Sequence, residues 1–146
     1  MTIQDILDAK GNRVITIPPH HTLHQALCTL VENKVGALVV QDREGSVLGI
    51  ITERDLMREV YQDTDLRRIC IENVMTRNLV IGFLDHEVEY VMSAMTEGRF
   101  RHMPVLKDGA LVGIVSIGDL VKSKLQHAQD EVIQYKNFVA LDWRAS

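Results

Sequence analysis

The most informative part of the sequence is Val47-Leu48-Gly49-Ile50-Ile51-Thr52-Glu53-Arg54-Asp55-Leu56. It returns as Leu111-Val112-Gly113-Ile114-Val115-Ser116-Ile117-Gly118-Asp119-Leu120, so that Gly49 corresponds to Gly113 and Asp55 to Asp119 at a constant separation of 64. Internal repeats are informative because each copy is one structural unit. The chain is therefore an internal duplication, with copies over about residues 10–62 and 74–127.

The similarity continues upstream with small changes of separation where turns are expected. Residues 14–17 align with 79–82 at a separation of 65, and residues 35–40 align with 101–106 at a separation of 66. This second alignment sets Val35-Gly36-Ala37 against Arg101-His102-Met103. The two copies therefore differ in charge at one strand.

Each copy predicts the order strand, helix, strand, strand, helix. The first helix of each copy shows apolar residues with i, i+3, i+4, i+7 spacing, typical of one buried helix face: Leu23, Ala26, Leu27 and Leu30, and then Val88, Val91, Met92 and Met95. The predicted strands lie at 14–17, 37–40 and 47–51 in the first copy and at 79–81, 103–106 and 111–115 in the second, and the last helices start near Thr52 and Ser116. Asp108-Gly109 is a strong hairpin signal.

A unit of about 50 residues buries little core of its own, so the copies are expected to pack together. The predicted fold class is α/β (α+β): two pseudo-twofold-related β-α-β-β-α motifs in one module, followed by a C-terminal helix. We divide the chain into residues 1–65, 66–128 and a helical extension at 129–146. The linker at about 62–73 is predicted to be partly helical.

Composition excludes several function classes. The chain of 146 residues carries a formal net charge of −4, which gives no broad attraction for nucleic acid or an anionic membrane. Cys28 and Cys70 have no CxxC spacing and are expected to be reduced core residues of a cytoplasmic protein. The sequence offers neither a membrane span nor a signal peptide.

The repeated junction supports two interpretations. Thr or Ser followed three residues later by an acid is a helix-capping pattern, although a capping box prefers Glu or Gln where Asp55 and Asp119 stand. The same geometry suits a nucleotide, because a helix N-terminus attracts phosphate and an Asp one turn later can accept hydrogen bonds from both ribose hydroxyls.

The glycine-hydrophobic-hydrophobic-Thr/Ser-x-x-Asp signature occurs twice, with Arg101-His102-Met103-Pro104-Val105 before the second and Val74-Met75-Thr76 opening the second copy. This combination resembles a tandem pair of cystathionine-β-synthase (CBS) domains, a Bateman module, over nearly the whole chain. The resemblance implies a non-enzymatic regulatory sensor that binds an adenosine nucleotide between the two motifs. The first candidate ligand is AMP, with ADP, ATP or NAD(H) as alternatives and no metal.

Carried over by position, the resemblance assigns Thr52 and Asp55 to one site and Ser116, Gly118 and Asp119 to the other. Arg54, Arg101 and His102 are the candidates for neutralising phosphate, the last two beside the second motif. The remaining candidates are apolar or small groups that would hold adenine: Ile17, Pro18, Val35, Gly36 and Ala37 in the first copy, and Ile81, Met103 and Pro104 in the second. The charge difference predicts unequal sites, with Asp119 more important than Asp55.

Two alternatives remain open at this point. One is a scaffold subunit that docks to a partner enzyme and has a vestigial nucleotide cleft. The other is a small metal enzyme built on His20, His21 and His24, for which the sequence shows no third ligand and no metalloprotease glutamate.

The last helix carries a narrow apolar seam. It advances in steps of 4, 3, 4, 3 and 4 through Val121, Leu125, Ala128, Val132, Tyr135 and Val139. This spacing predicts a homodimer about a twofold axis, with Trp143 near its edge. The alternative is a helix that folds back on its own module.

Overall fold

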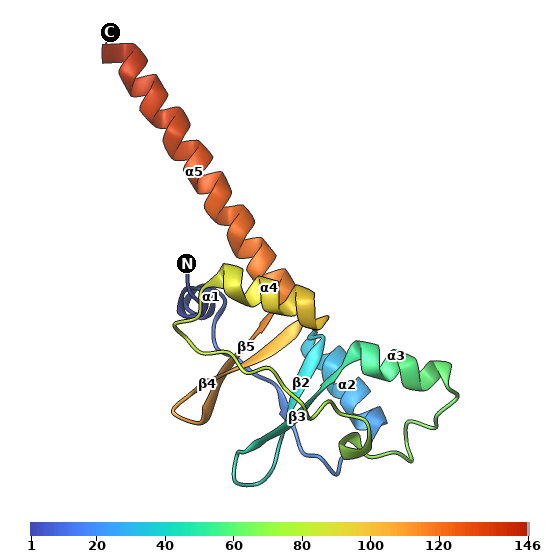
Figure 1. Cartoon of the computed structure of the whole chain (residues 1–146). Helices are drawn as coiled ribbons and strands as arrows, with labels where there is room; N and C mark the ends of the chain where they lie inside the picture. The colour runs from blue at the N-terminus through green and yellow to red at the C-terminus, as the bar shows by residue number, and fades with distance from the viewer. Residues whose placement is uncertain (146) are drawn as a thin grey trace.

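The computed structural model describes the backbone of residues 1–145 and the side chains of residues 1–140. Two small α/β lobes lie side by side, and one long helix projects from them (Figure 1). The first lobe contains β1–β3 with α2 and α3, and the second contains β4 and β5 with α1, α4 and the start of α5. The expected mixed α/β fold with a C-terminal helix is confirmed.

The first copy has the predicted order of elements. Its elements are β1 (Thr16–Ile17), α2 (Leu23–Asn33), β2 (Ala37–Gln41), β3 (Val47–Thr52) and α3 (Glu53–Tyr61). The sheet order is β1-β2-β3, with β1 parallel to β2 and β2 antiparallel to β3. Its core is closed by buried side chains from α2, β2 and β3, among them Leu23, Leu38 and Ile51.

The second copy repeats this plan with one exception. Its elements are α4 (Val88–Gly98), β4 (His102–Lys107), β5 (Ala110–Ser116) and α5 (Ile117–Ala145). The strand predicted at 79–81 is wrong, because pairing with β4 is reduced to a single parallel bridge between Gly82 and Val105. Val80 and Phe83 are about half exposed, so burial does not favour a longer strand there.

The strand pairing also corrects the alignment of the copies. Thr52 pairs with Ala37, and its counterpart Ser116 pairs with His102. The separation at β2 and β4 is therefore 65 and not 66, which makes Gly36 the counterpart of Arg101. The left-handed residues that end α2 and α4, Lys34 (φ 55°) and Arg99 (φ 56°), keep the same separation of 65. A slip of one residue matters because it moves every side chain to the opposite face.

The segment before each copy packs into the core of the other copy. Helix α1 (Ile3–Lys10) was not predicted, and its buried Ile3, Ile6 and Leu7 join the core of the second copy. Conversely, Ile71 of the 3₁₀ helix η1 (Ile71–Asn73) and Met75 lie in the core of the first copy. The helical turn in the linker is as expected, and the exchange joins the two copies into one module.

This exchange explains the glycine in both copies of the motif. A Cβ on Gly49 would lie 2.7 Å from the carbonyl oxygen of Thr76, and a Cβ on Gly113 would lie 2.8 Å from Leu7 Cδ1. Ile50 and Thr76 exchange two backbone hydrogen bonds of 3.0 and 2.9 Å across this contact. Only glycine lets the exchanged segment approach the strand this closely.

Helix α5 continues from the second motif for 29 residues without a break. It does not fold back on its own module but points away from it (Figure 1), and residues 125–140 carry almost no cover from the rest of the chain. Trp143, expected near a dimer edge, has its side chain outside the described residues. No helix in the described part of the chain is long and apolar enough to cross a membrane.

Candidate functional site

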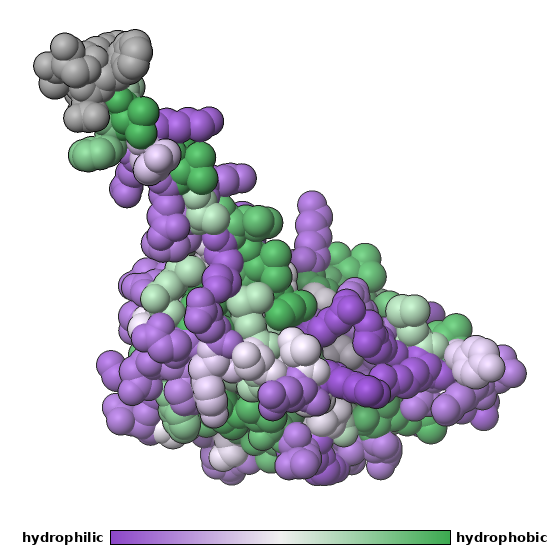
Figure 2. Space-filling model, turned by 45° about the horizontal axis from the view of Figure 1, so that its top comes forward, coloured by the Kyte–Doolittle hydropathy of each residue, from purple (hydrophilic) through white to green (hydrophobic). Residues whose placement is uncertain are grey.

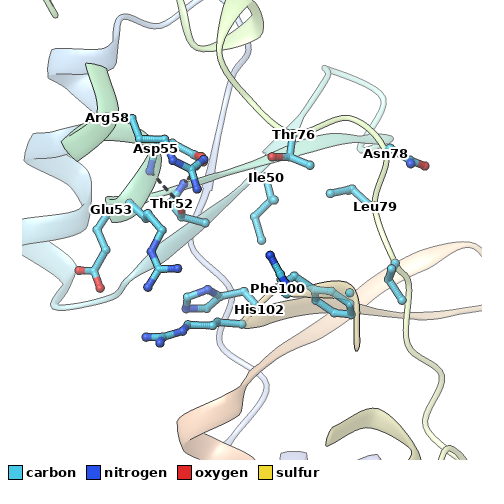
Figure 3. Close-up of a pocket in the computed structure, with 15 residues that line it drawn as sticks. Ile50, Thr52, Glu53, Asp55, Arg58, Thr76, Asn78, Leu79, Phe100 and His102 are labelled. Atoms are coloured by element: carbon cyan, nitrogen blue, oxygen red, sulfur yellow. Dashed lines mark hydrogen bonds and ion pairs between the residues drawn. The ribbon is translucent and has the colours of Figure 1, made fainter. Parts of the chain in front are cut away.

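A cavity of about 430 Å³ lies between the two copies. Three segments form its wall: the β3–α3 junction, the chain leading into the second copy, and the turn between α4 and β4. Figure 3 shows Thr52 and Asp55 on one side of the cavity, with Phe100 and His102 across from them. The lining residues are Ile50, Thr52, Glu53, Arg54, Asp55, Arg58, Thr76, Asn78, Leu79, Val80, Gly98, Arg99, Phe100, Arg101 and His102.

The β3–α3 junction fixes the acid of the first motif. Thr52 is the N-cap of α3, and its hydroxyl accepts a hydrogen bond from the Asp55 amide at 3.2 Å. In return, the Thr52 amide donates to Asp55 Oδ2 at 2.9 Å. The capping interpretation is therefore confirmed for this motif. The second carboxylate oxygen, Oδ1, has the Arg58 guanidinium 3.6 Å away, and Asp55 lines the cavity.

Positive charge in the cavity comes from side chains more than from the helix terminus. Two amides of the first turn of α3 already have protein partners, since Glu53 N donates to Gly36 O at 3.0 Å and Asp55 N donates to Thr52 Oγ1. Four guanidinium groups line the cavity against two carboxylates: Arg54, Arg58, Arg99 and Arg101 against Glu53 and Asp55. All four arginines are exposed and can therefore donate to an anion in the cavity, although Arg58 also lies near Asp55.

His102 lies between the two motifs. Its burial lowers the pKa of the imidazole below 6.5, while the carboxylates of Glu53 and Asp119 act to raise it. Burial therefore favours the neutral ring, which offers one donor and one acceptor. A Cβ on Gly36 would lie 3.4 Å from His102 Nε2, so the first copy closes over this ring.

The second motif is capped in the same way but has a different neighbour. Ser116 N donates to Asp119 Oδ2 at 2.8 Å, and Asp119 N donates to Ser116 Oγ at 3.1 Å. Lys10 Nζ lies 2.6 Å from the same carboxylate oxygen. Partial burial acts to raise the pKa of Asp119, but the hydrogen bonds from Lys10 and Ser116 outweigh it and hold the pKa below its usual value.

The structure groups the predicted residues differently from the sequence. Arg101 and His102 line the cavity of the first motif, although they precede the second motif in the chain. The predicted residues that meet at this cavity are Thr52, Arg54, Asp55, Arg101 and His102. Ser116, Gly118 and Asp119 lie at the other junction. Arg101 and His102, on which the prediction of a more important Asp119 rests, therefore lie in the cavity that Asp55 lines.

The predicted adenine contacts are not among the lining residues of this cavity. Ile17, Ala37, Met103 and Pro104 are buried, and Pro18, Val35, Gly36 and Ile81 are partly buried. Apolar contact in the cavity is instead available from Ile50, Leu79, Val80 and Phe100.

Sequence reasoning missed Thr76, Arg99 and Phe100, which also line the cavity. Thr76 could have been found, because it ends the Val74-Met75-Thr76 opening of the second copy. Arg99 carries no local signal beyond its place at the end of a helix. Among the described residues, no three His, Cys, Asp or Glu side chains come together as a metal site.

Comparison with known proteins gives the family. The family model named CBS domain matches residues 3–62 and 71–125. The mitochondrial CBS domain-containing protein CBSX3 of Arabidopsis thaliana is 30% identical over 147 residues, which cover 94% of this chain and 71% of that protein.

Solved structures give the same result. The CBS-domain containing protein ATU1752 from Agrobacterium tumefaciens is 42% identical, with a TM-score of 0.82 over 85% of this chain and 99% of that one. The CBS domain pair of protein MJ0100, solved in complex with 5′-methylthioadenosine and S-adenosyl-L-methionine, is 28% identical with a TM-score of 0.76, covering 88% and 98% of the two chains. The chain belongs to the CBS-domain family and is a tandem pair of CBS domains.

Proposed function

We propose that this protein is a non-enzymatic regulatory module that senses an adenosine nucleotide, AMP first, in the cavity beside Asp55. The observation that carries the proposal is the meeting of one capped carboxylate with four arginines and His102 in a cavity of about 430 Å³. That volume lies in the usual range of small-molecule sites, roughly 300–1,000 Å³. The adenosine compounds bound by the MJ0100 pair support the ligand class.

Different residues of the cavity wall suit the ribose, the base and the phosphate of a nucleotide. Asp55 is the acceptor for the ribose hydroxyls, since its carboxylate is held by Thr52 on one side and lines the cavity. Ile50, Val80 and Phe100 offer the apolar contact that a purine ring needs. The arginines neutralise phosphate, and their net excess of two positive charges over Glu53 and Asp55 matches the dianion of a monophosphate.

Calorimetry with AMP, ADP, ATP and NAD(H) tests this function. We expect AMP to bind at micromolar to millimolar concentration and to raise the melting temperature. Asp55→Ala should lower the affinity, and Lys107→Met, a change at an exposed lysine outside the cavity, should leave it unchanged. Absence of both heat and a melting shift with every adenine ligand would refute the proposal.

Helix α5 is the proposed contact with another protein chain. The apolar seam that starts at Val121 is exposed along α5, and Figure 2 shows hydrophobic side chains along the projecting helix. Leu125, Val132 and Tyr135 are each more than half exposed. The alternating spacing of the seam suits a second identical helix, so the proposed occupant is a second copy of the chain.

We take the module to act in the cytoplasm, which agrees with its two free cysteines.

Light scattering on truncated and substituted chains tests the dimer. Truncation after Gln126 and Val132→Lys should both give monomers, while Gln134→Lys, off the seam on the same helix, should remain dimeric. A full-length monomer, or a truncated chain that stays dimeric, would refute the role of α5. If a monomeric chain instead retains a partner enzyme regardless of Asp55→Ala, the scaffold function is correct and the sensor function is wrong.

A further inference from the structure

The ammonium group of Lys10 lies beside the carboxylate of the second motif. Lys10 ends α1, and its ammonium donates to Asp119 Oδ2 at 2.6 Å and to the carbonyl oxygen of Ile114 at 2.8 Å. Both partners belong to the β5–α5 junction of the second copy. The side chains of Lys10 and Asp119 are 31% and 26% exposed, so the pair is partly shielded from water.

Among the described residues, no cation from another part of the chain forms an ion pair with the carboxylate of the first motif. The carbonyl of Ile50, the counterpart of Ile114, accepts its hydrogen bond from the backbone amide of Thr76 at 2.9 Å. Asp55 forms its ion pair with Arg58, one turn along its own helix, at 3.6 Å and with a largely exposed guanidinium. The duplicated motifs therefore present different carboxylates, one facing a cavity and one already paired.

We infer that Lys10 closes the second motif to ligand and limits the CBS pair to one nucleotide per chain, bound beside Asp55. The inference rests on the proposed function. Ribose hydroxyls are neutral donors, and at Asp119 they would compete with the Lys10 ammonium, which already donates to Oδ2 and also holds Ile114 O. A hydrogen bond from a hydroxyl to a carboxylate is also charge-assisted, but the Lys10 ammonium adds the attraction between two opposite full charges, so replacing it with a neutral hydroxyl is unfavourable. Lys10 thus determines which of the two sites is used.

The inference also assigns a role to α1. This helix buries Ile3, Ile6 and Leu7 in the core of the second copy, and the fixed helix end places Lys10 over the β5–α5 junction. Gly113 permits the contact, since a Cβ there would collide with Leu7. Lys10 is therefore held beside the second motif by the core packing of α1.

Titration calorimetry with AMP on the full chain tests the inference through stoichiometry. The wild type should bind one AMP per chain, and Asp55→Ala should lose it. Lys10→Met should bind two, the second at least about tenfold more tightly than in the wild type. The double variant Asp55→Ala/Lys10→Met should bind one. Lys107→Met is the matched control and should keep one AMP.

The outcomes separate the inference from the proposed function. Two AMP in the wild type, one AMP in Lys10→Met, or weaker binding at the Asp55 site in Lys10→Met would overturn the inference and leave the sensor function intact. No AMP in either protein would overturn the sensor function itself. If Lys10→Met does not fold, as judged by circular dichroism, Lys10→Gln removes the charge with a hydrophilic side chain and carries the same expected result.

Discussion

The two aspartates of the duplicated motif should have opposite importance for stability and for binding. In Asp119→Ala the fold loses the acidic half of a helix cap, the hydrogen bond from Ser116 N, about 1 kcal/mol, and the partly exposed Lys10 ion pair, up to about 1 kcal/mol. In Asp55→Ala it loses the same cap, but the pair with Arg58 at 3.6 Å contributes little because the guanidinium is 66% exposed. The expected losses are therefore about 2 kcal/mol for Asp119→Ala and about 1 kcal/mol for Asp55→Ala.

These free energies correspond to measurable melting shifts. For a chain of this size, about 1 kcal/mol lowers the melting temperature by roughly 3–4 °C. Differential scanning calorimetry without ligand should therefore show a fall of about 6–8 °C for Asp119→Ala and about 3–4 °C for Asp55→Ala. Asp130→Ala, an exposed site on α5, should stay within about 0.5 kcal/mol of the wild type.

The order should reverse when AMP affinity is measured. Asp55→Ala removes a charged acceptor for ribose hydroxyls, which is worth about 1.5–3 kcal/mol, so affinity should fall by roughly 10- to 100-fold. Asp119→Ala should change affinity by less than about threefold, because Lys10 already holds that carboxylate. A larger loss at Asp119 would show that the cavity beside Asp55 is not the main ligand site, and equal losses would refute the difference between the two motifs.

Four further results are expected. Gly49→Ala should destabilise the fold by about 1–3 kcal/mol in urea unfolding, because its Cβ would lie 2.7 Å from Thr76 O. Gly118→Ala, whose Cβ would have its nearest atom at 3.6 Å, should instead stabilise the fold by about 0.5–1 kcal/mol. Because burial lowers the pKa of His102 below 6.5, the unfolded chain binds more protons in mild acid, so stability should fall as the pH drops from about 7 and His102→Gln should remove that fall. The lowered pKa of Asp119 contributes stability that is present above pH 3.8 and lost below it, and Asp119→Asn should flatten the stability curve there.

Most of the fold follows from local sequence. The apolar spacing of Leu23 to Leu30 and of Val88 to Met95 predicts α2 and α4, because a helix buries one face. Asp108-Gly109 predicts the β4–β5 hairpin, since this turn needs left-handed residues at both positions. These signals lie within one element and need no distant partner.

Other elements depend on distant contacts. Helix α1 is short, and its three buried side chains are buried only because the second copy, far along the chain, covers them. The sequence alignment of β2 with β4 is wrong by one position, because residues 37–40 of β2 are all buried. A strand buried on both faces shows no alternation that reports register.

The features of the site also fall into those that local sequence predicts and those that depend on distant contacts. The duplicated Thr52–Asp55 and Ser116–Asp119 caps follow from local sequence, because a helix start depends on four consecutive residues. The side chains that face each acid depend instead on how the two copies pack. The packing of the two copies brings Arg101 and His102 to Asp55. The exchange of leading segments brings Lys10 to Asp119, and burial of apolar side chains in the opposite copy drives that exchange.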